Sequence, residues 1–328
     1  MSNSVAVIIV NYGTGALAIE AAQSVLEREH GGAMVSIHIV DNASPNDDAA
    51  RLSAWLSALP GDERDRVTLH LEAENHGFGR GNNVALEFLE RQPEPPSRVF
   101  LLNPDARLEN EAIALMSACM DEHPAVAVIG AGVSYDDGEP ASAAYRFPSA
   151  ISEFVAAVNF GPLARVARRW QVAIGADARS GPVDWVTGAA VLARFEALRE
   201  IGFFDPVYFL YFEEVDLMRR LKRRGHQVWH LREARVIHAK GAATGVSARG
   251  DEIRRRRPPY WYESWYHYFR RNHGWFGAAI AATAWYSGAL LNIVIAALRG
   301  QPRHCPAHFF DDFTRIVARR LANPFHTS

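Results

Sequence analysis

The chain has 328 residues, of which 48% are hydrophobic and 22% are charged, a composition that excludes wholesale disorder. Its two cysteines, Cys119 and Cys305, are too few for a disulfide framework and favour a reducing compartment. Residues 1–218 carry 15 basic and 31 acidic residues, whereas residues 219–328 carry 20 basic and 6 acidic residues. The basic C-terminal third indicates contact with an anionic surface.

Short apolar runs alternate with amphipathic stretches over the first 131 residues. The runs predict strands, and the stretches between them predict helices. The expected strands are 5–10, 35–40, 67–71, 99–102 and 126–131, and the expected helices are 15–28, 46–59, 80–90 and 109–121. This alternation indicates βαβ units and an α/β fold with a mostly parallel central sheet flanked by helices. No basic segment precedes the first run, so we expect no secretory signal.

The pattern weakens in the middle of the chain and then returns. Residues 132–182 predict loops or short helices, and an apolar segment follows at 184–191. Helices are expected at 195–201 and 213–224, and two short strands at 228–231 and 234–238.

The C-terminal region has a composition of its own, so we divide the chain into a catalytic domain, 1–250, and a helical extension, 251–328. The basic run 254–257 precedes an aromatic stretch, 260–269, with the composition of a membrane-interface belt. Residues 274–298 lack charge and as a helix would span about 37 Å, enough to cross a bilayer. Docking on the membrane, spanning it, and a buried hairpin or oligomer contact all remain open. A last helix is expected at 308–321.

Polar residues follow the predicted strands, where a parallel sheet gathers its functional groups. Asp41 ends the second strand and can accept hydrogen bonds from a nucleobase or ribose, or can cap the next helix with Ser44. Residues 74–83 place glycines at alternate positions before a helix, which suits a phosphate contact and a structural turn equally. Asn103 and Asp105 suit a divalent cation, a β-turn, or both.

Two further groups carry chemistry. Glu213, Glu214 and Asp216 open a helix, where neighbouring carboxylates raise one another's pKa and suit a general base. The alternative is an acidic helix start favoured by the helix dipole. His238 ends a strand and is either a metal ligand or a structural histidine.

Six motifs in this order resemble family 2 glycosyltransferases of the GT-A fold, specifically the bacterial rhamnosyltransferase-like group. The resemblance covers residues 4–245. The motifs are Val-Ala-Val-Ile-Ile-Val-Asn-Tyr (5–12), Val-Asp-Asn-Ala-Ser (40–44), Asn-His-Gly-Phe-Gly-Arg-Gly-Asn-Asn (75–83), Leu-Leu-Asn-Pro-Asp-Ala (101–106), the segment 184–217, and His238.

The resemblance implies a role for each matching residue. Glu214 would be the catalytic base, and Asp105 and His238 would hold Mg²⁺ or Mn²⁺. The implied donor-binding residues are Asn11, Asp41, Asn75, Gly77, Gly79, Arg80, Asn82, Asn103 and Asp105. The implied acceptor-side residues are Trp185, Gly188, Glu213 and Asp216. Two positions depart from the family pattern, since Glu214 stands where an aspartate is usual and Asn103 replaces the first aspartate of the metal motif.

The implied reaction is an inverting single displacement that transfers L-rhamnose from dTDP-L-rhamnose. The nucleotide-sugar donor and a glycan or polyprenyl-diphosphate-linked acceptor are the expected partners, in cell-surface polysaccharide synthesis. We expect a cytoplasmic protein, peripheral at the inner face of the cytoplasmic membrane, without a nucleic acid partner. A homo-oligomer is left open.

Other functions remain as alternatives. The donor can be another nucleotide sugar such as a UDP-hexose, or the chain can be a non-catalytic nucleotide-sugar-binding protein. A nucleotidyltransferase would ordinarily carry a glycine-rich stretch with Lys or Arg after the first strand, whereas this chain has no lysine before Lys222.

Overall fold

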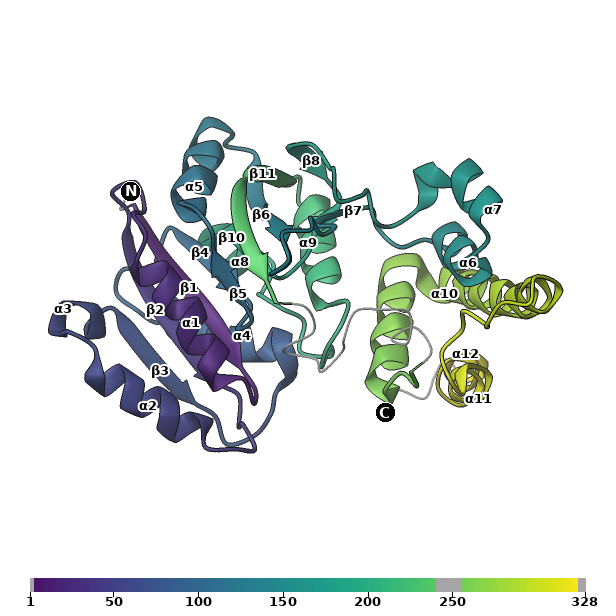
Figure 1. Ribbon diagram of the computed structural model, residues 1–328, viewed down its shortest axis with the longest axis horizontal. Coiled ribbons are helices and arrows are strands. Elements are labelled where there is room, and N and C mark those ends of the chain that lie inside the picture. Colours follow the sequence, from purple (N-terminus) through teal and green to yellow (C-terminus); the bar gives the residue numbers. More distant parts are fainter. Residues whose placement is uncertain (1–2, 240–254, 324–328) are drawn as a thin grey trace. The chain divides into compact units, whose positions relative to one another are not determined.

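The computed structural model describes residues 3–239 and 255–323, which form two compact units (Figure 1). The first unit comprises residues 3–145, 174–209 and 213–239. The second comprises residues 146–173, 210–212 and 255–323. Residues 146–173 therefore belong with the C-terminal helices, and not with the catalytic domain in which the sequence-based division placed them.

A nine-stranded sheet forms the centre of the first unit, in the order β3-β2-β1-β4-β10-β6-β11-β5, with β8 beside β11. Its strands are β1 (Ser4–Asn11), β2 (Met34–Asp41), β3 (Val67–Leu71), β4 (Arg98–Leu102), β5 (Ala106–Leu108), β6 (Val126–Ser134), β8 (Gly181–Val183), β10 (Ala190–Arg194) and β11 (Gln227–His238). Strands β1 to β4 are parallel, whereas β10 runs antiparallel between β4 and β6. The prediction of a mostly parallel sheet is thus confirmed.

Helices cover both faces of this sheet and bury its apolar strands (Figure 1). One face packs on α1 (Gly15–Leu26), α2 (Asp48–Ala58) and α5 (Ala112–Glu122). The other face packs on α4 (Gly77–Glu90), α8 (Phe195–Glu200) and α9 (Glu213–Arg223). The remaining elements of the unit are α3 (Gly61–Arg64) and a two-stranded sheet of β7 (Ala144–Tyr145) and β9 (Trp185–Val186).

One strand prediction was wrong. The two short strands expected at 228–231 and 234–238 are a single strand, β11, which pairs with β6 along its length. The polar residues between them occupy a shift of the pairing register between Leu231 and Arg235, so the ladder continues past them.

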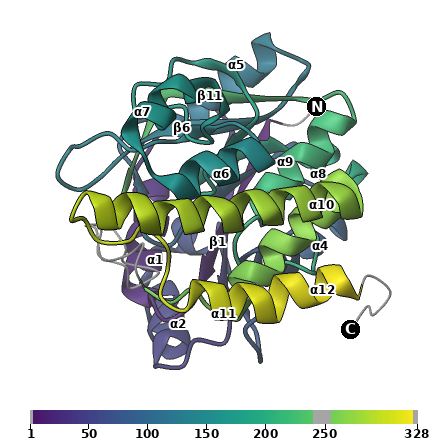
Figure 2. The same cartoon turned by 90° about the vertical axis from the view of Figure 1, so that its right-hand side faces the viewer.

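The second unit is helical. It contains α6 (Ala150–Val158), α7 (Gly161–Val166), the 3₁₀ turn η1 (Arg168–Trp170), α10 (Pro259–Leu298), α11 (Phe309–Phe313), the π-helical turn η2 (Thr314–Ala318) and α12 (Arg319–Ala322). Helices α6 and α10 pack closely (Figure 2). Gly288 permits this approach, because a Cβ at its position would lie 2.8 Å from the Phe154 carbonyl oxygen. The helix expected at 308–321 is present as a continuous helical run over 309–322, in which η2 is a π-helical turn between α11 and α12.

Helix α10 bends at Gly274, whose φ of 70° is left-handed and accessible to glycine. The aromatic stretch lies on the segment before this bend, where Trp265, Tyr262 and Tyr268 are each 0% exposed. Tyr262 and Trp265 pack with residues of α11 and of the later part of α10, and Tyr268 packs with Phe212, so these three rings face the protein and do not form an interface belt. This stretch is the hydrophobic core of the second unit.

Candidate functional site

Parallel pairing brings the ends of β1 and β2 together, with Asn11 opposite Asp41. The Asn11 side-chain amide donates to Asp41 Oδ1 (2.9 Å), Ser44 Oγ (3.0 Å) and Asp48 Oδ2 (3.2 Å). Asp48 also accepts from the Gly15 backbone N–H at 2.7 Å and so caps α1 from another helix. Asn11 and Asp41 are buried, and this network fixes the carboxylate at the sheet edge.

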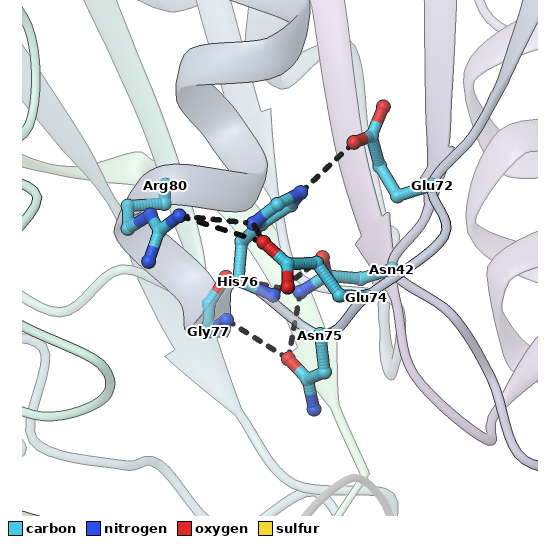
Figure 3. Close-up of polar contacts among 7 residues, drawn as sticks. All are labelled: Asn42, Glu72, Glu74, Asn75, His76, Gly77 and Arg80. Atoms are coloured by element: carbon cyan, nitrogen blue, oxygen red, sulfur yellow. Dashed lines mark hydrogen bonds and ion pairs between the residues drawn. The ribbon is translucent and has the colours of Figure 1, made fainter.

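Asn42, next along the chain, holds the glycine-rich turn (Figure 3). Its side-chain amide donates to Asn75 Oδ1 and to the Gly77 carbonyl, both at 3.0 Å. Its Oδ1 accepts from the His76 backbone N–H at 3.0 Å. Asn75 Oδ1 accepts in addition from the Gly77 N–H at 2.8 Å, so one buried amide orders the whole turn.

Close packing requires a glycine at positions 77 and 81, since a Cβ on Gly81 would lie 2.8 Å from Val10 Cγ1. Gly77 has a φ of +77°, and a Cβ there would lie 1.9 Å from the Phe209 carbonyl oxygen, which accepts from the Phe78 N–H. A Cβ on Gly79 would lie 3.4 Å from Glu213 Cβ. The N-terminus of α4 therefore lies against the start of α9.

The other predicted residues of this turn differ in placement. Arg80 is exposed, and its guanidinium lies 3.2 Å from His76 Nδ1 and 4.0 Å from Glu74 Oε1 (Figure 3). Asn82 is buried and its amide donates to the Phe78 carbonyl one turn earlier. This geometry leaves Arg80 accessible to a ligand, whereas Asn82 supports the helix.

Asn103, Asp105 and His238 meet at the same sheet edge although 133 residues separate the last two. His238 Nε2 lies 3.0 Å from Asp105 Oδ1 and 3.5 Å from Asn103 Nδ2. β5 pairs with β11 and places Ala106 opposite His238, which explains the approach. Asp105 is almost fully buried, whereas His238 is partly exposed.

This group fits a divalent cation. Within residues 3–239 and 255–323, no three side chains of histidine, cysteine, aspartate or glutamate gather at one point. Magnesium is commonly held by one or two protein carboxylates together with substrate phosphates and water. One buried carboxylate with one imidazole beside it matches such an open site.

Glu213 and Glu214 are adjacent carboxylates at the start of α9, of which Glu213 is buried and Glu214 is half-buried. Burial, followed by the charge of Glu214, raises the pKa of Glu213 well above its ordinary value. Burial also raises the pKa of Glu214, against the opposing effect of backbone hydrogen bonds. Among the described residues, Oε2 of neither glutamate has a hydrogen-bond partner. The preceding Tyr211 and Phe212 both have a φ of 69°, an uncommon conformation for aromatic residues that marks a strained entry to the helix.

The remaining predicted residues divide into two groups. Asp216 is fully buried and pairs with Arg220 at 2.7 Å, which supports a role in holding α9. Trp185 lies on β9 and stacks on Tyr145, with ring centroids 4.2 Å apart. A Cβ on Gly188 would lie 3.6 Å from the Phe78 ring.

Sequence reasoning missed Asn42 and Tyr145. Asn42 lies inside the motif 40–44, and its place directly after Asp41 at the end of a strand could have marked it. Burial and the charge of Glu214 raise the pKa of Tyr145 to about 12, so the phenol of Tyr145 interacts electrostatically with Glu214. No sequence pattern marked Tyr145.

The comparisons with known proteins agree on a class. A family model described as glycosyltransferase-like family 2 matches residues 2–261. The N-acetylglucosaminyl-diphospho-decaprenol L-rhamnosyltransferase of Mycobacterium tuberculosis H37Rv is 28% identical over 220 residues, 64% of this chain and 68% of that protein. Rhamnosyltransferase WbbL of Escherichia coli K12 is 23% identical over 177 residues, 50% of this chain and 61% of that protein.

A solved structure agrees on the fold. The mannosyltransferase PcManGT from Pyrobaculum calidifontis, in complex with GDP-Man and Mn²⁺, matches with a TM-score of 0.53 at 15% identity, covering 98% of this chain and 88% of that chain. The GT-A-like fold expected from the motifs is thereby confirmed. Since the family model covers most of the sequence, the chain belongs to the glycosyltransferase-like family 2.

Proposed function

We propose that the chain is an inverting glycosyltransferase that transfers L-rhamnose from dTDP-L-rhamnose to a glycan or polyprenyl-diphosphate-linked sugar. The names of the M. tuberculosis and E. coli relatives support the sugar, and the first of these names supports a lipid-linked acceptor. The observation that carries the proposal is the carboxylate pair of buried Glu213 and half-buried Glu214, whose helix lies against the glycine-rich turn.

In this proposal Glu214 is the catalytic base. Burial raises the pKa of both carboxyl groups, and the repulsion between their charges favours a state in which only one of them is ionised. The acceptor hydroxyl loses its proton to Glu214 while its oxygen bonds to the anomeric carbon, and the bond from that carbon to the nucleoside diphosphate breaks. A raised pKa makes Glu214 a better proton acceptor in this step.

Asp105 and His238 would hold Mg²⁺ or Mn²⁺, which supplies positive charge for the departing diphosphate. Asp41 is held at the sheet edge for the nucleoside, and the turn ordered by Asn42 receives the donor with Arg80 at its surface. Tyr145 and Trp185 offer a stacked aromatic platform of the kind that sugars contact on the acceptor side.

A donor screen with purified protein, Mg²⁺ or Mn²⁺, and mass detection of the released nucleotide tests this function. Glu214→Gln should keep the affinity for the donor while kcat falls about 10²–10⁴-fold, because a positioned base is lost. Glu196→Gln, on the exposed side of α8, is the matched control and should turn over normally.

The results of the donor screen and of the variants distinguish the donor, the catalytic base and the reaction class. Turnover of a UDP-hexose alone would replace the donor and leave the reaction class intact. Normal turnover of Glu214→Gln together with an inactive Glu213→Gln or Asp216→Asn would move the base elsewhere. Nucleotide-sugar binding without turnover of any donor would make the chain a binding protein.

We also propose that the protein docks on the inner face of the cytoplasmic membrane through α10. By length and composition, α10 is the one described helix that could cross a membrane, and 39% of its most apolar stretch is buried. At about 100° per residue, its exposed apolar side chains fall on one stripe about 100° wide, which also holds the exposed Thr283 and Ser287. The apolar side chains are Phe276, Ile280, Leu290, Leu291, Val294 and Leu298. The exposed Arg270, Arg271 and Arg299 flank the stripe and suit acidic headgroups.

A further inference from the structure

A cavity of about 320 Å³ lies inside the second unit. Helix α6 contributes Glu153, Ala156 and Ala157, and helix α10 contributes two tryptophans and Ala289. Phe212, Arg257 and residues 304–306 complete the wall. Its volume is in the range of small-ligand sites. Nothing in the reaction described above uses this cavity.

Arg257 supplies a cation to this cavity, whose wall also holds the carboxyl group of Glu153. Its guanidinium lies 3.8 Å from the centre of the Trp261 ring and 5.8 Å from that of Trp285. It forms an ion pair with no carboxylate of the part of the chain that the structure describes. Arg256, Arg315 and Arg320 of the same unit, in contrast, pair with Asp312 or Glu263.

Burial makes this cation costly. Desolvation lowers the pKa of the Arg257 guanidinium, although an arginine stays protonated near neutrality. The aromatic faces of two tryptophans compensate in part. A partly buried cation that lacks a counterion favours any anion that can reach it.

The other titratable groups of the cavity supply little negative charge. Burial raises the pKa of Glu153 to about 7, against the hydrogen bond that its Oε2 accepts from Trp265 Nε1 at 2.9 Å and against the charge of Arg257. Burial and the charge of Arg257 lower the pKa of His304, and burial raises the pKa of Cys305. At neutral pH, His304 is therefore neutral and Cys305 is a thiol, while burial opposes the ionisation of Glu153. Arg257 dominates the charge.

We propose that this cavity binds the phosphate or diphosphate head of an amphiphile, with Arg257 as the anion ligand and the aromatic walls around the first apolar carbons. We assign it to the lipid-linked acceptor, so this inference rests on the proposed function. Phe212, which lines the cavity, directly precedes Glu213 in the chain. A glycerophospholipid headgroup offers the same chemistry and is the competing source.

Direct binding tests the site without any sugar transfer. The purified protein is titrated with farnesyl diphosphate, inorganic diphosphate and dihexanoyl phosphatidylglycerol, and affinity is read by calorimetry. Farnesyl diphosphate should bind tightest, because only it combines a diphosphate with a prenyl chain. Arg257→Gln should weaken it at least about tenfold, the value of a hydrogen bond to a charged group. Arg315→Gln, an exposed arginine of the same unit, should stay within about twofold.

A second variant covers a failure of Arg257→Gln to fold, which circular dichroism would reveal. Ala289→Met fills the cavity and keeps the charge, and should also weaken farnesyl diphosphate at least about tenfold while dTDP binding is unchanged. If the folded variants bind farnesyl diphosphate as tightly as the wild type does, the proposed site is wrong. If phosphatidylglycerol binds as tightly as farnesyl diphosphate, the site is a phospholipid site and its assignment to the lipid-linked acceptor is wrong. A protein that turns over a donor but ignores farnesyl diphosphate refutes this inference alone. One that binds farnesyl diphosphate but uses no donor refutes the proposed function alone.

Discussion

Replacing His38 with glutamine should flatten the dependence of stability on pH. His38 lies on β2, 4% exposed, with Nδ1 3.2 Å from His70 Nε2 and Nε2 3.3 Å from Ser36 Oγ. Burial, and secondarily the charge of His70, lowers its pKa from 6.5 to about 4. Between these values the unfolded chain binds more protons than the folded one, so the free energy of unfolding rises with pH.

The size of the effect follows from the shift. At about 1.4 kcal/mol for each unit of pKa, the full penalty for His38 is about 3 kcal/mol, and about 2 kcal/mol of it is present at pH 4.5 relative to pH 7. This stability is complete above pH 6.5 and is lost as the pH falls towards 4. The glutamine variant lacks the titrating group and should lose about 2 kcal/mol less than the wild type over this interval.

Urea unfolding followed by far-ultraviolet circular dichroism at pH 4.5, 5.5 and 7 measures the difference. Other buried groups titrate in both proteins, so they cancel in the comparison of the two slopes. His308→Gln replaces an exposed histidine and should keep the wild-type profile. Parallel curves for the wild type and His38→Gln would refute the argument.

Three further predictions concern the site and the membrane. Asp105→Ala should abolish turnover and weaken nucleoside-diphosphate binding in Mg²⁺, as calorimetry can measure, and full activity in excess chelator would exclude the metal. Gly77→Ala should reduce donor affinity and lower Tm, because its Cβ would meet the Phe209 carbonyl at 1.9 Å, and a variant with wild-type Tm and affinity would contradict this packing. The wild type should float with acidic liposomes at low salt, whereas the double variant Ile280→Glu/Val294→Glu should not. A wild-type protein that stays at the bottom of the gradient would exclude docking on the membrane.

The strands and the polar residues at their ends were predictable because each is a local pattern. The run ending at Asp41 is apolar enough to be a buried strand, and the register of β1 and β2 follows once the sheet is parallel. The aromatic stretch was misinterpreted because composition does not distinguish a membrane interface from a buried helical core. The packing of Trp265 against residues far along the chain decides that question.

Contacts between side chains far apart in the sequence could not be predicted from local sequence patterns. The approach of His238 to Asp105 depends on β11 continuing through its register shift to reach β5, and the polar residues in that shift suggested a break instead. Asn42 was overlooked because its contacts are to a turn more than 30 residues away. The family motifs named positions in the site, but they carried no information about which side chains hold it together.

The antiparallel strand β10 has a consequence for biosynthesis. It fills the place between β4 and β6, yet it is made of residues 190–194, long after both neighbours. At about 5–20 residues per second, the 60 residues from the end of β6 to the end of β10 take about 3–12 seconds to synthesise. Throughout that time the nascent chain carries two apolar strands whose facing edges lack their partner, and such edges recruit other chains. Chaperone dependence in this protein should therefore be greatest for chains stalled before residue 190 and should fall once β10 has emerged.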